Sequence, residues 1–391
     1  MGIRLSGIYT LGLGFRQQVL ETGGEVSIGT EISRFDDFRT KNVRYNGTPI
    51  YFKYSQPLFG FNKMKWDKKI ELLKNEESKK DKVQEIENIR EESTLLFFDA
   101  LQAQIDIEIA NYNYQNTLRL LDIENGKIKL GTTSYDKILQ INLNITNYKK
   151  EFDISKYKYN NAMAKLKNFI GLADSELIKL KVPNIPSSFV VDTALAFKLA
   201  KENRSEFLAF EIKRVESQMN TISETKKNIA FSLSGGFGVN RAGNTIASIY
   251  NNPNQQQNFS IGFSLPILDW KRKKIAIKKA HEEELLVNYQ NRMEENSIRE
   301  EIRAIINVFD FLKVSIDYSI LADSIANERF QLTKVLYQSG KVSLTELFIA
   351  QNEKDTYKKN YINTIKEYWM TIFLIRRVTL YDFLKESYIR N

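Results

Sequence analysis

Hydrophobic and polar residues alternate with a period of two in two separate regions of the chain. In the first region the alternation covers residues 3–15, 26–33 and 50–55, and in the second it covers residues 231–240 and 259–265. Such alternation predicts β-strands with one apolar and one polar face. We therefore expect strands within residues 3–56 and within residues 230–266. Their apolar faces fit either lipid or the core of a soluble sandwich, and the strands alone leave both open.

Helical spacing replaces this alternation in the two longest segments of the chain. Residues 61–125 contain neither proline nor glycine, and the same is true of residues 270–338. Each segment is followed by a break that contains a glycine and then by another helical pattern. We therefore expect helical hairpins over residues 61–170 and 270–385. Helices of this length are well above the average for globular proteins and indicate bundles or coiled coils.

One further helix is expected over residues 192–228, ahead of the second strand region. It follows a turn-rich linker, residues 171–190, which contains Pro183 and Pro186. A loop rich in Asn and Gln, residues 251–258, is expected to precede the last strand.

The chain repeats itself at a constant offset, since Pro57 and Pro266 are 209 residues apart and other matches share that spacing. The further matches are IREE at 89–92 and 298–301, Gly131 and Gly340, Ser134 and Ser343, YKK at 148–150 and 357–359, and Tyr159 and Tyr368. Matches in equivalent positions of two strand–helix–break–helix patterns indicate a duplication. We predict a first structural repeat at residues 1–190 and a second at residues 191–391.

The composition argues against several classes of protein that could have this organisation. The 391 residues are 42% hydrophobic and 27% charged, and no run of 18 apolar residues predicts a transmembrane helix. There is no cysteine, and His281 is the single histidine, in a charged helical stretch where we expect a solvated side chain. We therefore predict no catalytic residue, no metal site and no cofactor. The net charge of +9 comes from interspersed basic and acidic residues, which argues against a nucleic-acid partner.

The chain resembles the TolC-like family of outer-membrane efflux proteins. The resemblance covers nearly the whole chain and is carried by the strand-to-helix phrases SQPLFGF (55–61) and SLPILDW (264–270) and by the hairpin YQSGKVSLTELFIAQNEKDTYKKNYINTIKEYW (337–369). The stretch QQVLETGGEVSIGTEISRFDD (17–37) resembles a branch of the family with an additional early β-hairpin.

This resemblance implies a fold class, a location and a function. The fold would be mixed α and β, with a trimeric outer-membrane β-barrel continued by a periplasmic α-helical barrel. The protein would be a non-enzymatic channel of a tripartite efflux or type I secretion system in a Gram-negative bacterium. Its partners would be two further copies, a periplasmic adaptor protein, an inner-membrane pump and outer-membrane lipid. The first repeat has no counterpart of the helix at 192–228, so we expect the natural N-terminal part to be missing from this sequence.

The resemblance also implies a pore constriction where the helices converge. Glu346, six residues after Gly340, matches an acidic position of the family, and a carboxylate from each of three copies would attract cations. The residues at and beside the equivalent position of the first repeat are Lys137 and Asp136. The sequence from Ser343 to Glu346 also fits a capping box, which would explain this glutamate without a pore.

The remaining candidates lie at the two ends of the helical hairpins. Glycines at the turns predict a positive φ, and the resemblance adds docking of the adaptor to the tips. These tip residues are Gly131, Thr132, Thr133, Gly340, Lys341 and Val342. At the opposite ends, Pro57 and Pro266 mark the strand-to-helix junctions, because a proline cannot donate to a sheet. Phe61 and Trp270 fit either interface aromatics or ordinary core packing.

Two other classes of protein share parts of this pattern. A periplasmic adaptor also combines β-structure with a helical hairpin, but it has one hairpin rather than a duplicated pair. A soluble coiled-coil scaffold would not need the alternating strands.

Overall fold

The computed structural model describes residues 6–389, except for 39, 59, 130, 132, 133, 174, 187, 188, 228, 229 and 265–267. It divides into two compact units. Unit 1 comprises residues 1–78 and 206–295, and unit 2 comprises residues 79–205 and 296–391. Each unit takes segments from both predicted repeats, so packing joins the two halves of the chain rather than separating them.

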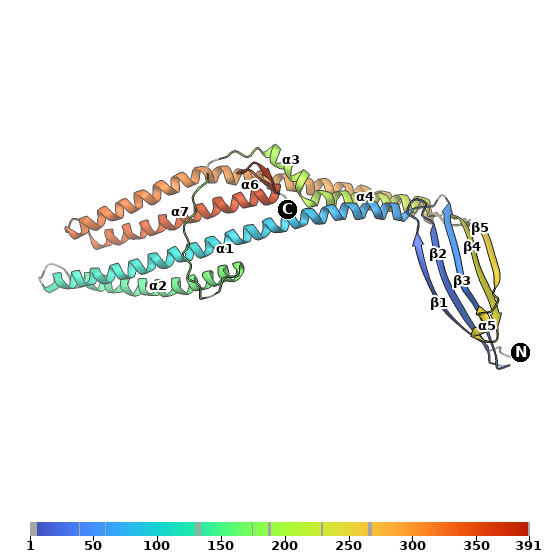
Figure 1. Cartoon of the computed structure of the whole chain (residues 1–391). Helices are drawn as coiled ribbons and strands as arrows, with labels where there is room; N and C mark the ends of the chain where they lie inside the picture. Colours follow the sequence, from blue (N-terminus) through green and yellow to red (C-terminus); the bar gives the residue numbers. More distant parts are fainter. Residues whose placement is uncertain are drawn as a thin grey trace. The chain divides into compact units, whose positions relative to one another are not determined.

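Unit 1 contains a five-stranded antiparallel sheet in the order β1-β2-β3-β4-β5 (Figure 1). The strands are β1 (Ser6–Gln18), β2 (Glu25–Asp37), β3 (Asn42–Leu58), β4 (Ala230–Gly243) and β5 (Asn254–Ser264). The short helix α5 (Ile246–Tyr250) lies between β4 and β5. The central pairing of β3 with β4 joins segments from the two repeats, so the sheet requires both.

The sheet has one apolar and one polar face, because neighbouring residues of a strand point to opposite sides. Phe15, Ile28, Phe52 and Phe237 are paired in one row across β1 to β4. The adjacent row on the other face consists of Gly14, Gly29, Tyr51 and Gly238. A Cβ atom on Gly29 would come within 2.8 Å of the Tyr51 hydroxyl oxygen, so glycine lets this ring lie across the strands.

Three helical segments pack together in unit 1. They are the first part of α1 (Lys63–Lys129), α4 (Ser205–Lys226) from Glu206 onward, and the first part of α6 (Arg272–Gln338). Ile70 of α1 packs with Ile212 and Val215 of α4 in one buried cluster. On the α6 side, the Thr221 hydroxyl of α4 donates to Glu284 (2.9 Å).

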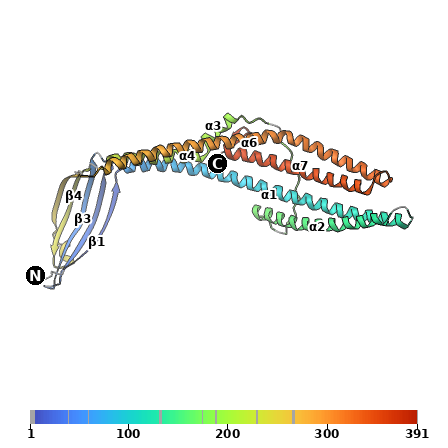
Figure 2. The same ribbon diagram turned by 180° about the vertical axis from the view of Figure 1, so that it is seen from behind.

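Unit 2 contains the rest of α1 and α6 together with α2 (Tyr135–Ile170), α3 (Thr193–Asn203) and α7 (Leu344–Thr379). Its helices run side by side in the order α2, α1, α7 and α6, as two opposite views agree (Figures 1 and 2). Near the hairpin turns, all four contribute to one core around Phe330, Leu347 and Phe348. A small hairpin of β6 (Tyr381–Asp382) and β7 (Ser387–Tyr388) follows α7.

The helices of the two hairpins match at the same offset as the sequence repeat. Helices α1 and α6 both have 67 residues, and Lys63 and Arg272 begin them 209 residues apart. Helices α2 and α7 both have 36 residues, and Tyr135 and Leu344 again differ by 209. None of the helices in the described part of the chain has an apolar stretch long enough to cross a membrane.

Several predicted boundaries need correction. The helix predicted over 192–228 is two helices, α3 and α4, because Arg204 between them is extended (φ −72°, ψ 144°). The end of α7 is Thr379 rather than residue 385, because Leu380 adopts a left-handed conformation (φ 49°). Strand β5 begins at Asn254, so five of the eight residues of the predicted loop at 251–258 are part of the sheet.

Candidate functional site

The tip of the second hairpin is a capped turn. Gly340 has a left-handed φ of 74°, as its position predicts. The Ser343 hydroxyl accepts from the Glu346 backbone N–H (3.1 Å), and the Glu346 carboxylate accepts from the Ser343 N–H (2.6 Å). These two bonds form the predicted capping box. The bonds from Ser343 lower the pKa of Glu346 below its ordinary value, because they favour the charged carboxylate.

The tip of the first hairpin has the same turn without the same cap. Gly131 has a φ of 70°, but the Ser134 side chain makes no capping hydrogen bond at the start of α2. Asp136 is exposed in the first turn of α2, and Lys137 is half-buried next to it. The predicted tip residues Thr132 and Thr133 lie outside the described residues.

The two tips are connected through the starts of their returning helices. The Gln140 side chain of α2 donates to the Thr345 hydroxyl of α7 (3.4 Å). Of the other predicted tip residues, Lys341 is exposed and Val342 packs against the core beneath the turn. Glu346, Asp136 and Lys137 therefore belong to the same end of unit 2.

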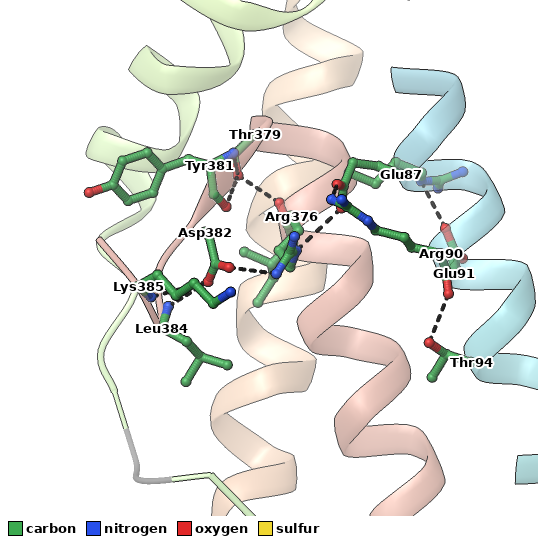
Figure 3. A network of polar contacts seen from close by, with 12 residues as sticks. Glu87, Arg90, Glu91, Thr94, Arg376, Thr379, Tyr381, Asp382, Leu384 and Lys385 are labelled. Atoms are coloured by element: carbon green, nitrogen blue, oxygen red, sulfur yellow. Dashed lines mark hydrogen bonds and ion pairs between the residues drawn. The ribbon is translucent and has the colours of Figure 1, made fainter. Parts of the chain in front are cut away.

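A polar seam, defined here as the paired side chains of α1 and α7, joins the two repeats in unit 2. At the end of the seam farthest from the hairpin tips, Arg376 of α7 donates to the fully buried Glu87 of α1 (3.2 Å) and to Asp382 (2.5 Å) (Figure 3). Arg90 also pairs with Glu87, and Arg377 pairs with Glu91 (3.1 Å). A buried carboxylate needs such partners, because an unpaired charge in the interior is strongly destabilising.

The seam continues toward the tips in steps of seven residues along α1. Asp99 pairs with Lys366 (2.6 Å), and Asp106 pairs with Lys359 (3.3 Å). At the next step, the buried Asn113 amide donates to Asp355 (2.6 Å). A period of seven keeps these side chains on one face of α1, so the pairs hold the two hairpins in register.

Closer to the tips, α1 makes its polar contact with α6 instead of α7. The Tyr337 hydroxyl donates to the buried Glu124 carboxylate (3.0 Å), which also accepts from Lys127 (2.7 Å). Burial, followed by the charge of Glu124 and this hydrogen bond, raises the pKa of Tyr337 well above its ordinary value. The seam was missed by sequence reasoning, although acidic residues seven apart facing a lysine-rich helix could have indicated it.

A cavity of about 430 Å³ lies beside this contact, between α1, α6 and α7. Arg119 and Lys127 line it from α1, Lys334 from α6, and Leu347 and Gln351 from α7. No acidic side chain is among the residues that line it in the described part of the chain. The cavity is therefore cationic and partly apolar.

The junction residues of unit 1 depart from the expectation in one respect. Pro57 is paired opposite Ser232 within β3, and the pairing continues to Leu58 opposite Phe231. The strand therefore ends one residue after the proline rather than at it. Phe61 is half-buried before α1, whereas Trp270 is 88% exposed before α6. Pro266 lies outside the described residues.

No family model matches the chain, and no characterised protein sequence matches it either. Its fold, however, is that of solved outer-membrane proteins and channels. The structure of VceC from Vibrio cholerae has a TM-score of 0.71 at 11% identity, covering 96% of this chain and 87% of that one. The Campylobacter jejuni CmeC outer membrane channel has a TM-score of 0.70 at 13% identity, covering 96% and 77%.

The Neisseria gonorrhoeae MtrE outer membrane channel, in its open state, has a TM-score of 0.65 at 13% identity, covering 96% of this chain and 80% of that one. The described chain therefore has the TolC-like outer-membrane channel fold, and the predicted resemblance is confirmed at the level of the fold. Identities this low carry the architecture and leave the function to be argued from the residues of this chain.

Proposed function

We propose that this protein is the outer-membrane channel subunit of a tripartite efflux or type I secretion system. Three copies would join their sheets into one β-barrel and their helices into one periplasmic tunnel, through which substrates pass without chemistry. The observation that carries this proposal is the exposed apolar face of the five-stranded sheet. In its row across β1 to β4, Phe15 is 81% exposed, and Ile28, Phe52 and Phe237 are 43–50% exposed.

The two faces of the sheet differ as the wall of a membrane pore requires. On the apolar face, large side chains such as Leu11, Leu13 and Phe259 are exposed. On the polar face, a cavity of about 430 Å³ is lined by Arg16, Glu25, Glu31 and Lys53 among others. An apolar outer face suits lipid, and a charged inner face suits a water-filled lumen.

Helix α6 supports the proposal of several copies. It carries an exposed heptad stripe, in which apolar residues follow each other at alternating steps of three and four, with one interruption at Glu328. The stripe consists of Phe311, Val314, Tyr318, Leu321, Ile325, Leu332 and Val335, each between 53% and 69% exposed. Spacing of this kind is the seam of a coiled coil, so this face favours a partner helix.

Helix α2, at the other edge of unit 2, offers a surface for that stripe. Its exposed apolar residues are Tyr135, Leu139, Leu143, Ile154 and Tyr157. Because α6 and α2 occupy opposite edges of the row of helices, α6 of one copy would pack on α2 of the next. Repetition of this contact closes a ring.

The strand directions set one condition on closure of the sheet. All four neighbouring pairs are antiparallel, so β1 and β5 run in the same direction. A closed sheet made of such copies has a parallel pairing at each junction, or contains one further strand there. Both edge strands are long, and an open edge of this kind is a liability that closure removes.

The tips and junctions take the roles that the resemblance implies. Glu346, Asp136 and Lys137 would form a mixed-charge constriction, with Glu346 kept ionised by its capping bonds. The turns at Gly131 and Gly340 would receive a periplasmic adaptor, which links the channel to an inner-membrane pump. At the other end, Trp270 would lie at the membrane interface, because its ring is exposed next to the sheet-to-helix junction.

The duplication is a proposal as well. We infer that residues 1–190 and 191–391 derive from one ancestral unit, which the equal helix lengths and the shared offset support.

Electrical recording tests the proposed function. The full chain, purified in detergent, is expected to have the mass of three copies and to produce stepwise conductance in a planar lipid bilayer. Glu31→Lys, on the polar face, should shift ion selectivity toward anions, whereas Glu176→Lys makes the same charge change at an exposed position of the linker after α2 and should leave the selectivity unchanged. A monomer without conductance would contradict the proposal.

A further inference from the structure

The cavity between α1, α6 and α7 has properties that the transport function does not explain. It begins beside the second tip, at Gln338, and its residues on α1 extend from there over about three turns, from Lys127 to Asn116. It lies where the first repeat, through α1, meets both helices of the second. A ligand in this cavity would therefore contact both repeats at once.

The charges around the cavity are of one sign. Arg119 and Lys334 form no ion pair with any described residue, while Lys127 is paired with Glu124. Glu124 lies behind this lysine and is 1% exposed, with its carboxylate engaged by Lys127 and by the Tyr337 hydroxyl. Two uncompensated cations on facing helices would attract an anion.

The cavity also offers a hydrogen-bond donor that the protein leaves unused. Gln351 is 1% exposed at its floor, and the Nε2 atom has no hydrogen-bond partner within the described chain. A buried amide without a partner is destabilising, so an acceptor at this place would be favourable. A carboxylate is such an acceptor, whereas an ammonium group is not, because it has no free lone pair.

The rest of the lining is aliphatic. Leu120 and Ile123 of α1 face the same cavity as Leu347 of α7. Inorganic anions are strongly hydrated and gain nothing from such a surface, but a compact apolar body would be removed from water there. A volume of about 430 Å³ is within the usual range of small-molecule sites.

We propose that this cavity binds a small organic carboxylate with an apolar body. Its carboxylate would lie toward Arg119, Lys334 and the Gln351 amide, and its body against Leu120, Ile123 and Leu347. Because these groups come from α1, α6 and α7, binding would hold the two hairpins together below the polar seam. Occupancy of the cavity would thus stabilise the folded arrangement of unit 2 by mass action.

A matched pair of probes tests the charge requirement. Isothermal titration calorimetry on the full chain in detergent would compare 4-phenylbutyrate with 4-phenylbutylamine, which has the same body and the opposite charge. We expect saturable binding of the acid, at least tenfold weaker binding of the amine, and weaker binding of butyrate, which lacks the ring. Equal binding of acid and amine, or no binding of the acid at millimolar concentration, would overturn the proposal.

Charge reversals locate the site. Arg119→Glu and Lys334→Glu should each weaken binding of 4-phenylbutyrate at least tenfold. Lys150→Glu makes the same charge change on an exposed position of α2 and should leave the affinity unchanged. If all three variants weaken binding equally, the attraction is that of the whole protein and the specific site is refuted. The conductance of the same variants, measured separately, distinguishes this result from a failure of the channel proposal.

Discussion

Helices α2 and α7 have the same length and follow the same glycine turn, yet they are buried very differently. Seven residues of α2 are buried, whereas fourteen residues of α7 are. The cause is position, since α7 packs between α1 and α6 and α2 lies at an edge of unit 2. The comparison teaches that two helices of equal length at equivalent places in the chain can differ in role, since α7 holds the unit together from its interior and α2 keeps an exposed apolar face.

The tyrosines at the same place in the two helices give the largest expected contrast. Tyr368 is 1% exposed and stacks on Phe309 at 5.5 Å, while Tyr159 is half-buried. Tyr368→Ala should lower the free energy of unfolding by about 3–5 kcal/mol, as for other large aromatic residues in a core. Tyr159→Ala should cost about 1 kcal/mol. Chemical denaturation monitored by circular dichroism compares them, and equal losses would remove the distinction between the helices.

The end of α7 should be nearly as sensitive. Arg376→Ala leaves Glu87 buried without its partner from α7, and a broken buried pair costs about 3–5 kcal/mol. Adding Glu87→Leu should recover part of that loss, because it removes the buried carboxylate of α1, while the buried Asp382 keeps its bonds from the Leu384 and Lys385 N–H groups. The measurement compares the unfolding midpoints of the single and double variants. If Glu87→Leu does not recover stability, Arg376 acts mainly through its contact with Asp382.

The N-terminal caps of α2 and α7 should contribute to stability by different amounts, and the expected difference is smaller than those above. Ser343→Ala removes a capping bond and should destabilise α7 by about 1 kcal/mol. Ser134→Ala removes no capping bond from α2 and should change stability by less than about 0.5 kcal/mol. Amide hydrogen exchange in the first turn of each helix measures the two effects separately, and similar effects would contradict the asymmetry of the tips.

The smallest effect concerns the pH dependence of the second tip. The pKa of Glu346 is lowered in the folded chain, so its stabilisation is present at neutral pH and is lost as the pH falls through the unfolded value of about 4.3 and below. Wild type and Glu346→Gln should therefore differ in hydrogen exchange of the tip at pH 7 and converge near pH 3. A difference that persists at pH 3 would mean that the charge of Glu346 is not what protects the cap.

Local sequence signals predicted the long elements of the fold well. The absence of proline and glycine over residues 61–125 predicts one long helix, and α1 is continuous through it. The break between α3 and α4 carried no such signal. It occurs where the Asn203 amide donates to the Thr379 carbonyl (3.0 Å) and Arg204 pairs with Glu301 (3.3 Å), contacts that the folded chain alone creates.

The site was less predictable than the fold for the same reason. Glycine turns and the capping box are encoded by adjacent residues, so they could be read directly. The polar seam and the cationic cavity join residues more than 200 positions apart, as in the bond of Asn113 to Asp355. Their pairing depends on the order in which α2, α1, α7 and α6 pack, and the spacing of hydrophobic and polar residues along the sequence does not specify that order.

Disulfide cross-linking between copies tests the central claim most directly. The chain has no cysteine, so Leu139→Cys on α2 and Leu332→Cys on α6 would introduce the only thiols. Both positions are exposed, and each lies eight residues from its turn glycine, Gly131 or Gly340. Oxidation of the double variant in detergent should yield a covalent trimer, while each single variant should yield no ladder. A double variant that remains monomeric would contradict the proposal that α6 of one copy packs on α2 of the next.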